Sequence, residues 1–167
     1  MELLIVVVIM GVVYTLSVGS FAKINDEALK VTLGTLKEYL QGLPHEKSVK
    51  FLCLDNCSSC DIYIDGVKIQ ETSEKLDNLV DETIRVYTYD FAYGIQQKSK
   101  DIFFNEENVE EEVCFSYEVD KKGIGDQVYV EFKERVYDFS TYFTQTAQFD
   151  SLEEALESKE NLMRELR

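Results

Sequence analysis

The chain has 167 residues, and 17 Lys and Arg against 32 Asp and Glu give it a formal net charge of −15. Such an acidic chain lacks the clustered cations that a nucleic-acid partner requires, so we predict no nucleic-acid binding. Hydrophobic residues make up 45% of the sequence and there is one Pro, which excludes long disordered or collagen-like stretches.

The N-terminal segment, residues 3–22, contains no charged residue. As a helix it would extend ~30 Å, which matches the hydrocarbon core of a bilayer. A buried strand is the alternative for its β-branched run, but strands seldom exceed about ten residues. The segment therefore predicts a transmembrane helix over residues 1–22, whose apolar positions include Leu3, Ile5, Val8, Gly11 and Val18.

A one-sided leucine pattern follows the apolar segment, with Leu29, Leu33, Leu36 and Leu40 spaced by three or four residues. Intervening charges, such as Lys37 and Glu38, predict a wet face on the same helix. Gly42 and Pro44 are typical of a helix end. We predict one continuous helix over residues 1–42, with a membrane-spanning half (1–22) and an amphipathic half (23–42), on the order of 60 Å long.

Residues 1–11, MELLIVVVIMG, resemble the N-terminus of the type IV pilin superfamily, which includes the pseudopilins of type II secretion. In that family a prepilin peptidase cuts after a basic leader, before a Phe that becomes methylated, and a Glu follows inside an apolar helix. Glu2 matches that Glu and residues 3–9 match the apolar run. The sequence shows no such leader or Gly-Phe site before Glu2. We expect Met1 to be an internal residue of a longer reading frame; the alternative is a chain that is not processed like a pilin.

The resemblance implies a role for Glu2, which would neutralise the N-terminal amine of a neighbouring subunit in a filament. It also implies that Leu29, Leu33, Leu36 and Leu40 bundle helices and seat each head on its own helix. The expected location is a single pass through a bacterial inner membrane, with the head in the periplasm or in an extracellular filament. Expected partners are other pilin-like subunits, a prepilin peptidase and the inner-membrane assembly platform. Signal-peptidase cleavage after Ala22 is the alternative fate of this segment.

The remainder, residues 43–167, predicts a β-rich head. Alternating apolar residues predict strands over 49–54, 61–65, 83–89, 113–119, 127–132 and 136–143. Short connections such as Asp65-Gly66 predict hairpins and an antiparallel sheet. Ser151 and Glu154 form a capping-box pattern that opens a C-terminal helix over 151–166. The predicted fold class is α+β, a long N-terminal helix packed on an antiparallel sheet, as in pilins.

The four cysteines could form an iron–sulfur site, a zinc site or disulfides. Cys53, Cys57 and Cys60 have the spacing by which radical SAM enzymes hold an iron–sulfur cluster, but those enzymes need a barrel larger than this chain. Zinc with Cys114 as the fourth thiolate is the second option. Disulfides are the default outside the cytosol. We predict a Cys57–Cys60 disulfide, with Cys53 and Cys114 paired or left as thiols, and no cofactor or metal.

No catalytic constellation is recognisable in the sequence. His45 is the only His, and its position after Pro44 indicates a solvated loop residue. The acidic run over residues 105–112 indicates a solvated face rather than a Ca²⁺ loop. We therefore expect no enzyme. The resemblance of residues 1–11 implies a pilin-like or pseudopilin subunit of a type IV pilus or type II secretion pseudopilus. The alternative function is a membrane-anchored or secreted binding module with an acidic β-sheet head.

Overall fold

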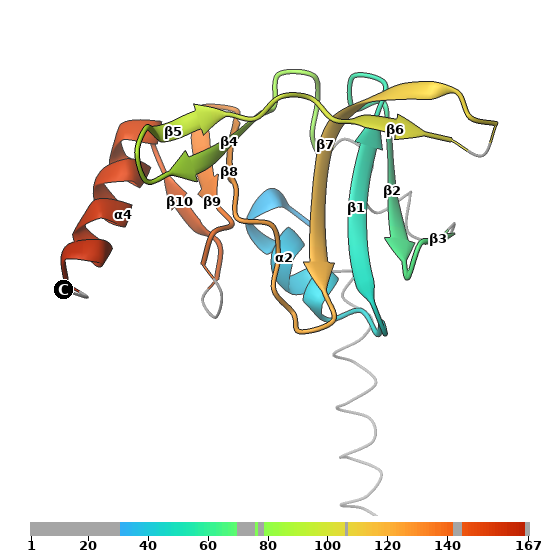
Figure 1. Cartoon of the computed structure of the whole chain (residues 1–167), viewed down its shortest axis with the longest axis horizontal. Coiled ribbons are helices and arrows are strands. Elements are labelled where there is room, and N and C mark those ends of the chain that lie inside the picture. Colours follow the sequence, from blue (N-terminus) through green and yellow to red (C-terminus); the bar gives the residue numbers. More distant parts are fainter. Residues whose placement is uncertain (1–30, 70–75, 77–78, 106, 142–144, 166–167) are drawn as a thin grey trace, which may run out of the picture. The chain divides into compact units, whose positions relative to one another are not determined.

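A computed structural model of the chain describes residues 31–69, 76, 79–105, 107–141 and 145–165. They belong to one compact unit, residues 31–167. Figure 1 shows two β-sheets and two short helices in this part of the chain. Every pair of neighbouring strands is antiparallel, as the short connections predict.

The first sheet contains five strands around the central strand β1. Its spatial order is β3 (Val67–Ile69), β2 (Ser59–Ile64), β1 (Ser48–Leu54), β7 (Glu110–Asp120) and β6 (Ile102–Phe104). Alternation decides which face of β7 is buried: Phe115, Tyr117 and Val119 point into the core, whereas the residues between them are half-buried. Asp65 and Gly66, both with positive φ, form the predicted tight turn between β2 and β3.

The second sheet also contains five strands, in the order β10 (Ala147–Phe149), β9 (Arg135–Asp138), β8 (Tyr129–Phe132), β4 (Arg85–Asp90) and β5 (Gly94–Gln97). The strand predicted over 136–143 ends at Asp138. There the Asp138 carboxylate accepts a hydrogen bond from the Ser140 N–H at 2.7 Å, a local turn that competes with strand pairing.

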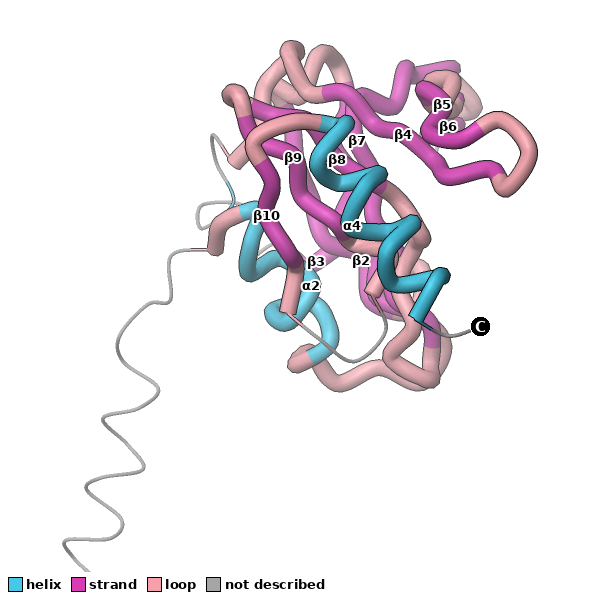
Figure 2. The backbone as a smooth tube through the Cα atoms, turned by 90° about the vertical axis from the view of Figure 1, so that its left-hand side faces the viewer, coloured by secondary structure: helices cyan, strands magenta, loops and turns pink. Residues whose placement is uncertain are grey.

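Two helices pack on these sheets. Helix α2 (Leu33–Gln41) lies between the sheets in Figure 1, and its leucines join residues of β1, β2, β7 and β8 in the main hydrophobic core. Helix α4 (Leu152–Glu165) packs on the second sheet (Figure 2). There Ala155 belongs to one hydrophobic cluster with Tyr129 and Val136. The Ser151 hydroxyl accepts a hydrogen bond from the Glu154 N–H at 3.2 Å, so the predicted cap opens this helix.

The predicted fold class is wrong. The described residues form a mostly β structure with two sheets, and the helix predicted to continue to residue 42 instead begins at Leu33. Thr32 is extended, with φ −123° and ψ 165°, and it forms a reciprocal capping box with Thr35. The hydroxyls of these two threonines therefore cap a helix that begins at Leu33, at a point where the leucine spacing alone predicts an uninterrupted helix. The predicted boundary between residues 42 and 43 falls inside the unit that begins at Val31.

The predicted location as a single-pass inner-membrane protein is contradicted as well. Within the described ranges, neither helix has both the length and the apolar character that a membrane crossing requires. Helix α2 has 9 residues, and helix α4, with 14, carries several acids. The segment that motivated the prediction, residues 1–22, lies outside the described residues.

A close approach between Gly125, in the connection from β7 to β8, and Tyr117 of β7 yields a testable prediction. A Cβ at Gly125 would lie 1.9 Å from the Tyr117 Oη and 2.5 Å from its Cζ, and the Tyr117 ring is fully buried. We expect Gly125→Ala to lower the free energy of unfolding by about 1–3 kcal/mol, because the core must shift to admit the methyl group. Denaturant unfolding of the two proteins measures the difference.

The matched control is Gly42→Ala. Gly42 has φ −75°, and an added Cβ there meets no atom closer than 3.4 Å. It should change stability by less than about 0.5 kcal/mol. Equal losses at the two glycines would contradict the packing that we describe around Tyr117.

Candidate functional site

The predicted assembly leucines that the structure describes are all buried within the unit itself. Leu36 and Leu40 are 0% exposed and Leu33 is 3% exposed. They contact the inner face of the first sheet, where Phe51 and Tyr117 belong to the same cluster. These three side chains therefore seat helix α2 on its own head and have no surface left for a second subunit. Leu29 lies outside the described residues.

Lys37, assigned by the sequence to a wet face, is one of the largest fully buried side chains, at 2% exposure. Its ammonium donates hydrogen bonds to the Thr141 carbonyl and, at 3.3 Å, to the Thr141 hydroxyl. Burial lowers the pKa of Lys37, while the nearby carboxylates of Glu38 and Asp138 act in the opposite direction. The wet-face prediction fails at Lys37 because the loop that follows β9 covers this side of α2 through Thr141.

The four cysteines form two disulfides, Cys53–Cys60 and Cys57–Cys114. Disulfide formation agrees with the sequence prediction, but the predicted Cys57–Cys60 pair is wrong. In the β1–β2 hairpin Cys53 lies directly opposite Cys60, with a Cα–Cα distance of 4.1 Å. Strand register therefore selects Cys60 as the partner of Cys53.

A β-bulge explains the second pair. The register between β1 and β7 shifts at Cys53 and Leu54, which face Phe115 and Val113, so that Cys114 is the extra residue. A bulge of this kind redirects a side chain. Cys57, at the tip of the β1–β2 turn with φ +63°, meets Cys114 there, and their Cα atoms lie 5.3 Å apart.

The two disulfides exclude both metal sites considered for the cysteines, the iron–sulfur cluster and the zinc ion. With all four sulfurs bonded in pairs, no thiolate remains to ligate zinc or an iron–sulfur cluster. Among the residues that the structure describes, no group of three or more His, Cys, Asp or Glu side chains is arranged to hold a metal ion.

His45 is a half-buried bridge between two loops rather than a solvated loop residue. Its Nδ1 lies 2.8 Å from the Leu43 carbonyl oxygen and its Nε2 lies 3.1 Å from the Asp120 carbonyl oxygen. Both partners are acceptors, so only the doubly protonated ring donates to both. These backbone hydrogen bonds, Leu43 first, raise the pKa of His45.

This bridge predicts a pH dependence. A folded-state pKa above the unfolded value of about 6.5 means that His45 contributes its full stability below that pH. The contribution is lost as the pH rises through the raised value. We expect wild type to exceed His45→Gln in melting temperature more at pH 5.5 than at pH 8.5. A difference between the two proteins that is constant across this range would contradict the bridge.

The first sheet carries a groove on its surface, which sequence reasoning missed. We call it the outer-face groove: about 900 Å³ on the side of the first sheet that faces away from α2. Its floor is formed by Leu52, Leu54 and Tyr63, which with Val113 and Phe103 make a small apolar cluster separate from the main core. The signal was the unbroken apolar run of β1, Phe51 to Leu54, which is apolar on both faces.

Other predicted site residues fall outside the described part of the chain. These are Glu2, proposed for subunit registration, and the membrane-helix positions Leu3, Ile5, Val8, Gly11 and Val18.

Comparison with known proteins leaves the family open. No family model, curated protein or solved structure matches this chain.

Proposed function

We propose that this protein is a pilin-like subunit that assembles through its N-terminal segment into a type IV pilus or a type II secretion pseudopilus. The observation that carries the proposal is Glu2, an acid that directly precedes twenty residues without charge, 3–22. An isolated carboxylate is costly next to apolar surroundings, and an opposite charge supplied by a neighbouring copy lowers that cost.

The two disulfides support an assembly outside the cytosol. Disulfides persist in oxidising compartments, and here they fasten the β1–β2 hairpin internally and to β7. A head exposed on a filament benefits from such cross-links, since unfolding of one subunit would disrupt its neighbours.

Burial of the α2 leucines supports a version of the proposal in which the subunit contacts come from the chain before Val31. Leu33, Leu36 and Leu40 pack within the head. The proposed contacts between subunits are therefore made by Glu2 and the apolar residues that follow it. The partners are other pilin-like subunits, with a prepilin peptidase and an assembly platform acting on them.

The test is Glu2→Ala in cells that make the full chain. We expect at least a tenfold loss of sheared or pelleted filament, because the charge that registers neighbouring subunits is gone. Glu27→Ala, which removes an acid located after the uncharged residues 3–22, is the matched control and should assemble normally. Thiol titration should find no free thiols in either variant, which shows that the head has folded.

The outcome also separates the two function classes. Normal assembly and normal function of Glu2→Ala would refute the filament proposal and favour a binding module. Loss of assembly together with free thiols would mean that the head had misfolded. In that case Glu2→Gln, which keeps the size of the side chain and removes its charge, tests whether the charge is needed for assembly.

A further inference from the structure

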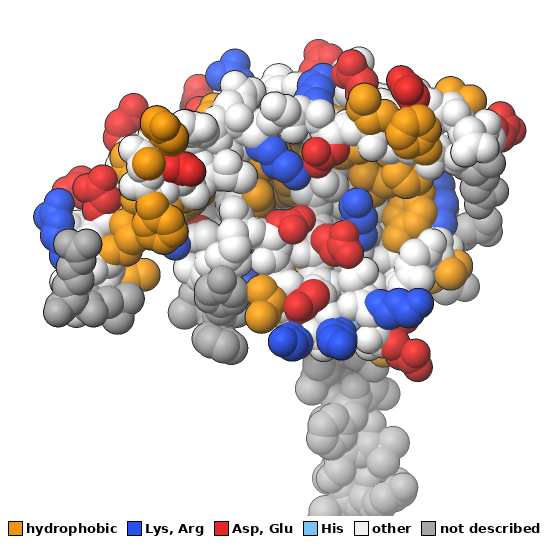
Figure 3. Space-filling view, in the orientation of Figure 1, with side chains coloured by type: hydrophobic (Ala, Val, Ile, Leu, Met, Phe, Trp, Pro, Cys, Tyr) orange, Lys and Arg blue, Asp and Glu red, His pale blue; other side chains and the backbone are white. Residues whose placement is uncertain are grey.

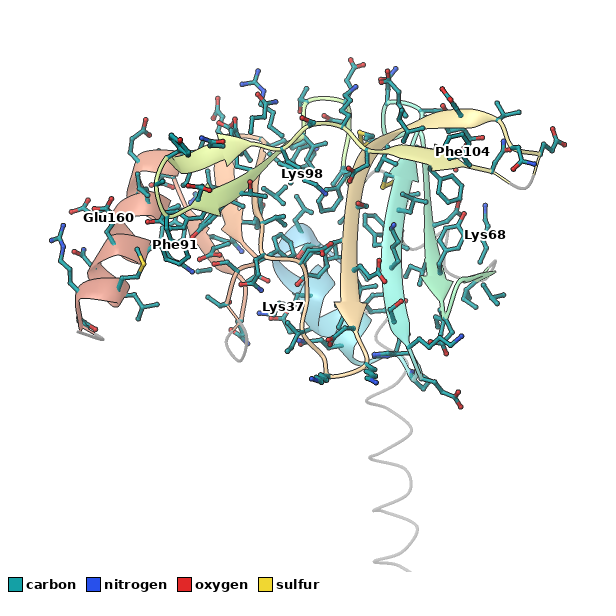
Figure 4. The ribbon with its side chains drawn as sticks, viewed as in Figure 1. Lys37, Lys68, Phe91, Lys98, Phe104 and Glu160 are labelled. Carbon is teal, nitrogen blue, oxygen red and sulfur yellow. A yellow bond between two sulfur atoms is a disulfide. The ribbon has the colours of Figure 1, made fainter. Side chains whose placement is uncertain are left out.

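The outer-face groove lies between two walls. One wall is β6, where Phe103 packs on Tyr63 with ring centroids 6.2 Å apart and Phe104 remains 57% exposed. The other is the β2–β3 turn, where Val67 is 65% exposed. Figure 3 shows the apolar atoms of this region as an orange hollow open to solvent, and Figure 4 shows Phe104 and Lys68 on either side of it. An exposed apolar hollow of this kind marks a binding surface.

The bulge at Cys114 explains why the hollow exists. Beyond it, β7 continues past the end of β1 and carries β6 as an arm, so Val113 joins Leu52 and Leu54 on the outer face instead of the core. The Cys57–Cys114 disulfide fixes the base of this arm. The groove is therefore held by covalent and strand contacts and is already shaped for an occupant.

The charges around the groove are unbalanced. Two lysines line it, and each has an acid of its own: Lys68 lies 2.7 Å from Asp61, and Lys50 lies 4.0 Å from Glu118. Three more acids line the groove, Asp55, Glu107 and Glu111. No lysine or arginine of the described residues lies within 4.0 Å of these three carboxylates. The lining thus has a net charge of 2 − 5 = −3.

We propose that the outer-face groove binds a segment of a partner protein that combines apolar side chains with Lys or Arg. The apolar side chains would pack on Phe104, Val67 and the half-buried Tyr63, and the cations would meet Asp55, Glu107 and Glu111 at the rim. A volume of about 900 Å³ is at the upper end for small-ligand pockets, and the open hollow suits several consecutive side chains. A second copy fits poorly, since each copy has a net charge of −15.

This inference goes beyond filament assembly, and neither proposal depends on the other. The probes are three acetylated and amidated pentapeptides, KFKLK, EFELE and KGKSK, titrated into the purified full chain by calorimetry. We expect KFKLK to bind at least tenfold more tightly than either other peptide, because only it supplies both the apolar and the cationic groups. Its affinity should fall with added salt.

Matched variants locate the binding. Phe104→Ser should weaken KFKLK binding at least fivefold, and Glu107→Gln with Glu111→Gln should weaken it and reduce its salt dependence. The controls are Phe91→Ser, which removes an 86% exposed Phe at the β4–β5 turn, and Glu157→Gln with Glu160→Gln on α4. Figure 4 shows Phe91 and Glu160 at the far end of the unit from Phe104, so the controls should bind KFKLK normally.

Several results would overturn the proposal. They are no binding of KFKLK, equal binding of KFKLK and EFELE, and equal losses in the control and groove variants. Concentration-dependent self-association that Phe104→Ser abolishes would overturn it too, because the occupant would then be a second copy. Glu2→Ala should leave peptide binding unchanged, so failure of one proposal is distinguishable from failure of the other.

Discussion

Leu36→Ala is expected to lower the free energy of unfolding by about 2–5 kcal/mol, one of the largest effects of any single substitution in this protein. Leu36 is fully buried where α2 meets both the first sheet and residues of the second. Truncation removes favourable burial and leaves a cavity, which the flanking strands cannot close because their register is fixed by hydrogen bonds. Urea unfolding followed by far-UV circular dichroism measures the loss.

Leu162→Ala is the matched control for this prediction. Leu162 is also a helical leucine, but it is 50% exposed on α4. Its truncation should cost less than about 1 kcal/mol. If the two substitutions had the same effect, α2 would not be the element that joins the two sheets.

Removal of the Cys57–Cys114 disulfide, by changing both residues to Ala, is expected to cost about 4 kcal/mol. The bond closes a loop with a sequence separation of 57, and the cost follows from the conformational freedom that the unfolded chain regains. The same double change at Cys53 and Cys60, whose separation is 7, should cost only about 2 kcal/mol. Thermal unfolding of the oxidised proteins compares the two variants.

The order of these two losses tests the pairing itself. Were the bonds Cys57–Cys60 and Cys53–Cys114, each double variant would leave two unpaired cysteines from different bonds, and both would be similarly unstable. Peptide mapping of the intact protein gives the connectivity directly. A linked peptide pair containing Cys57 and Cys60 would contradict the structure.

The Cys57–Cys114 disulfide contributes to the shape of the outer-face groove as well as to stability. The bond at Cys114 holds the base of the β6–β7 arm, which forms one wall of the outer-face groove. We therefore infer that loss of this bond weakens peptide binding more than loss of Cys53–Cys60 does. The comparison separates the role of this bond in stability from its role in shaping the groove.

Sequence patterns predicted the strands well where each strand has a single buried face. β7 alternates strictly from Phe115 to Val119, and the turn at Asp65-Gly66 has the residues that its positive φ angles require. The helix cap at Ser151 was equally predictable, because the Ser151 hydroxyl and the Glu154 carboxylate form hydrogen bonds with residues three or four positions away. Such features depend on neighbours in sequence, so no tertiary information is needed to find them.

Features that depend on distant parts of the chain could not be predicted. The start of α2 is an exception, because the Thr32–Thr35 capping box is a local signal, but the leucine spacing that continues through this point obscured it. Burial of Lys37 depends on Thr141, more than a hundred residues away. The cysteine pairing depends on a bulge in β7, which has no composition signal in the sequence.

The groove was missed for a related reason. Phe51 to Leu54 is a continuous apolar run, and such a run predicts a strand buried on both faces. One face does pack on α2, and on the other face Leu52 and Leu54 pack with Val113, Tyr63 and Phe103 beside the groove. Strand pattern alone does not reveal how far the β6–β7 arm reaches across that face.

The central claim, assembly through Glu2, is tested most directly by mass spectrometry of the protein isolated from its native cells. We expect a peptide that contains Glu2 and the residues that follow it to be recovered from a multimeric filament fraction. A released monomer whose first residue is Lys23 would contradict it, because both the acid and the apolar segment would then be discarded before the protein acts.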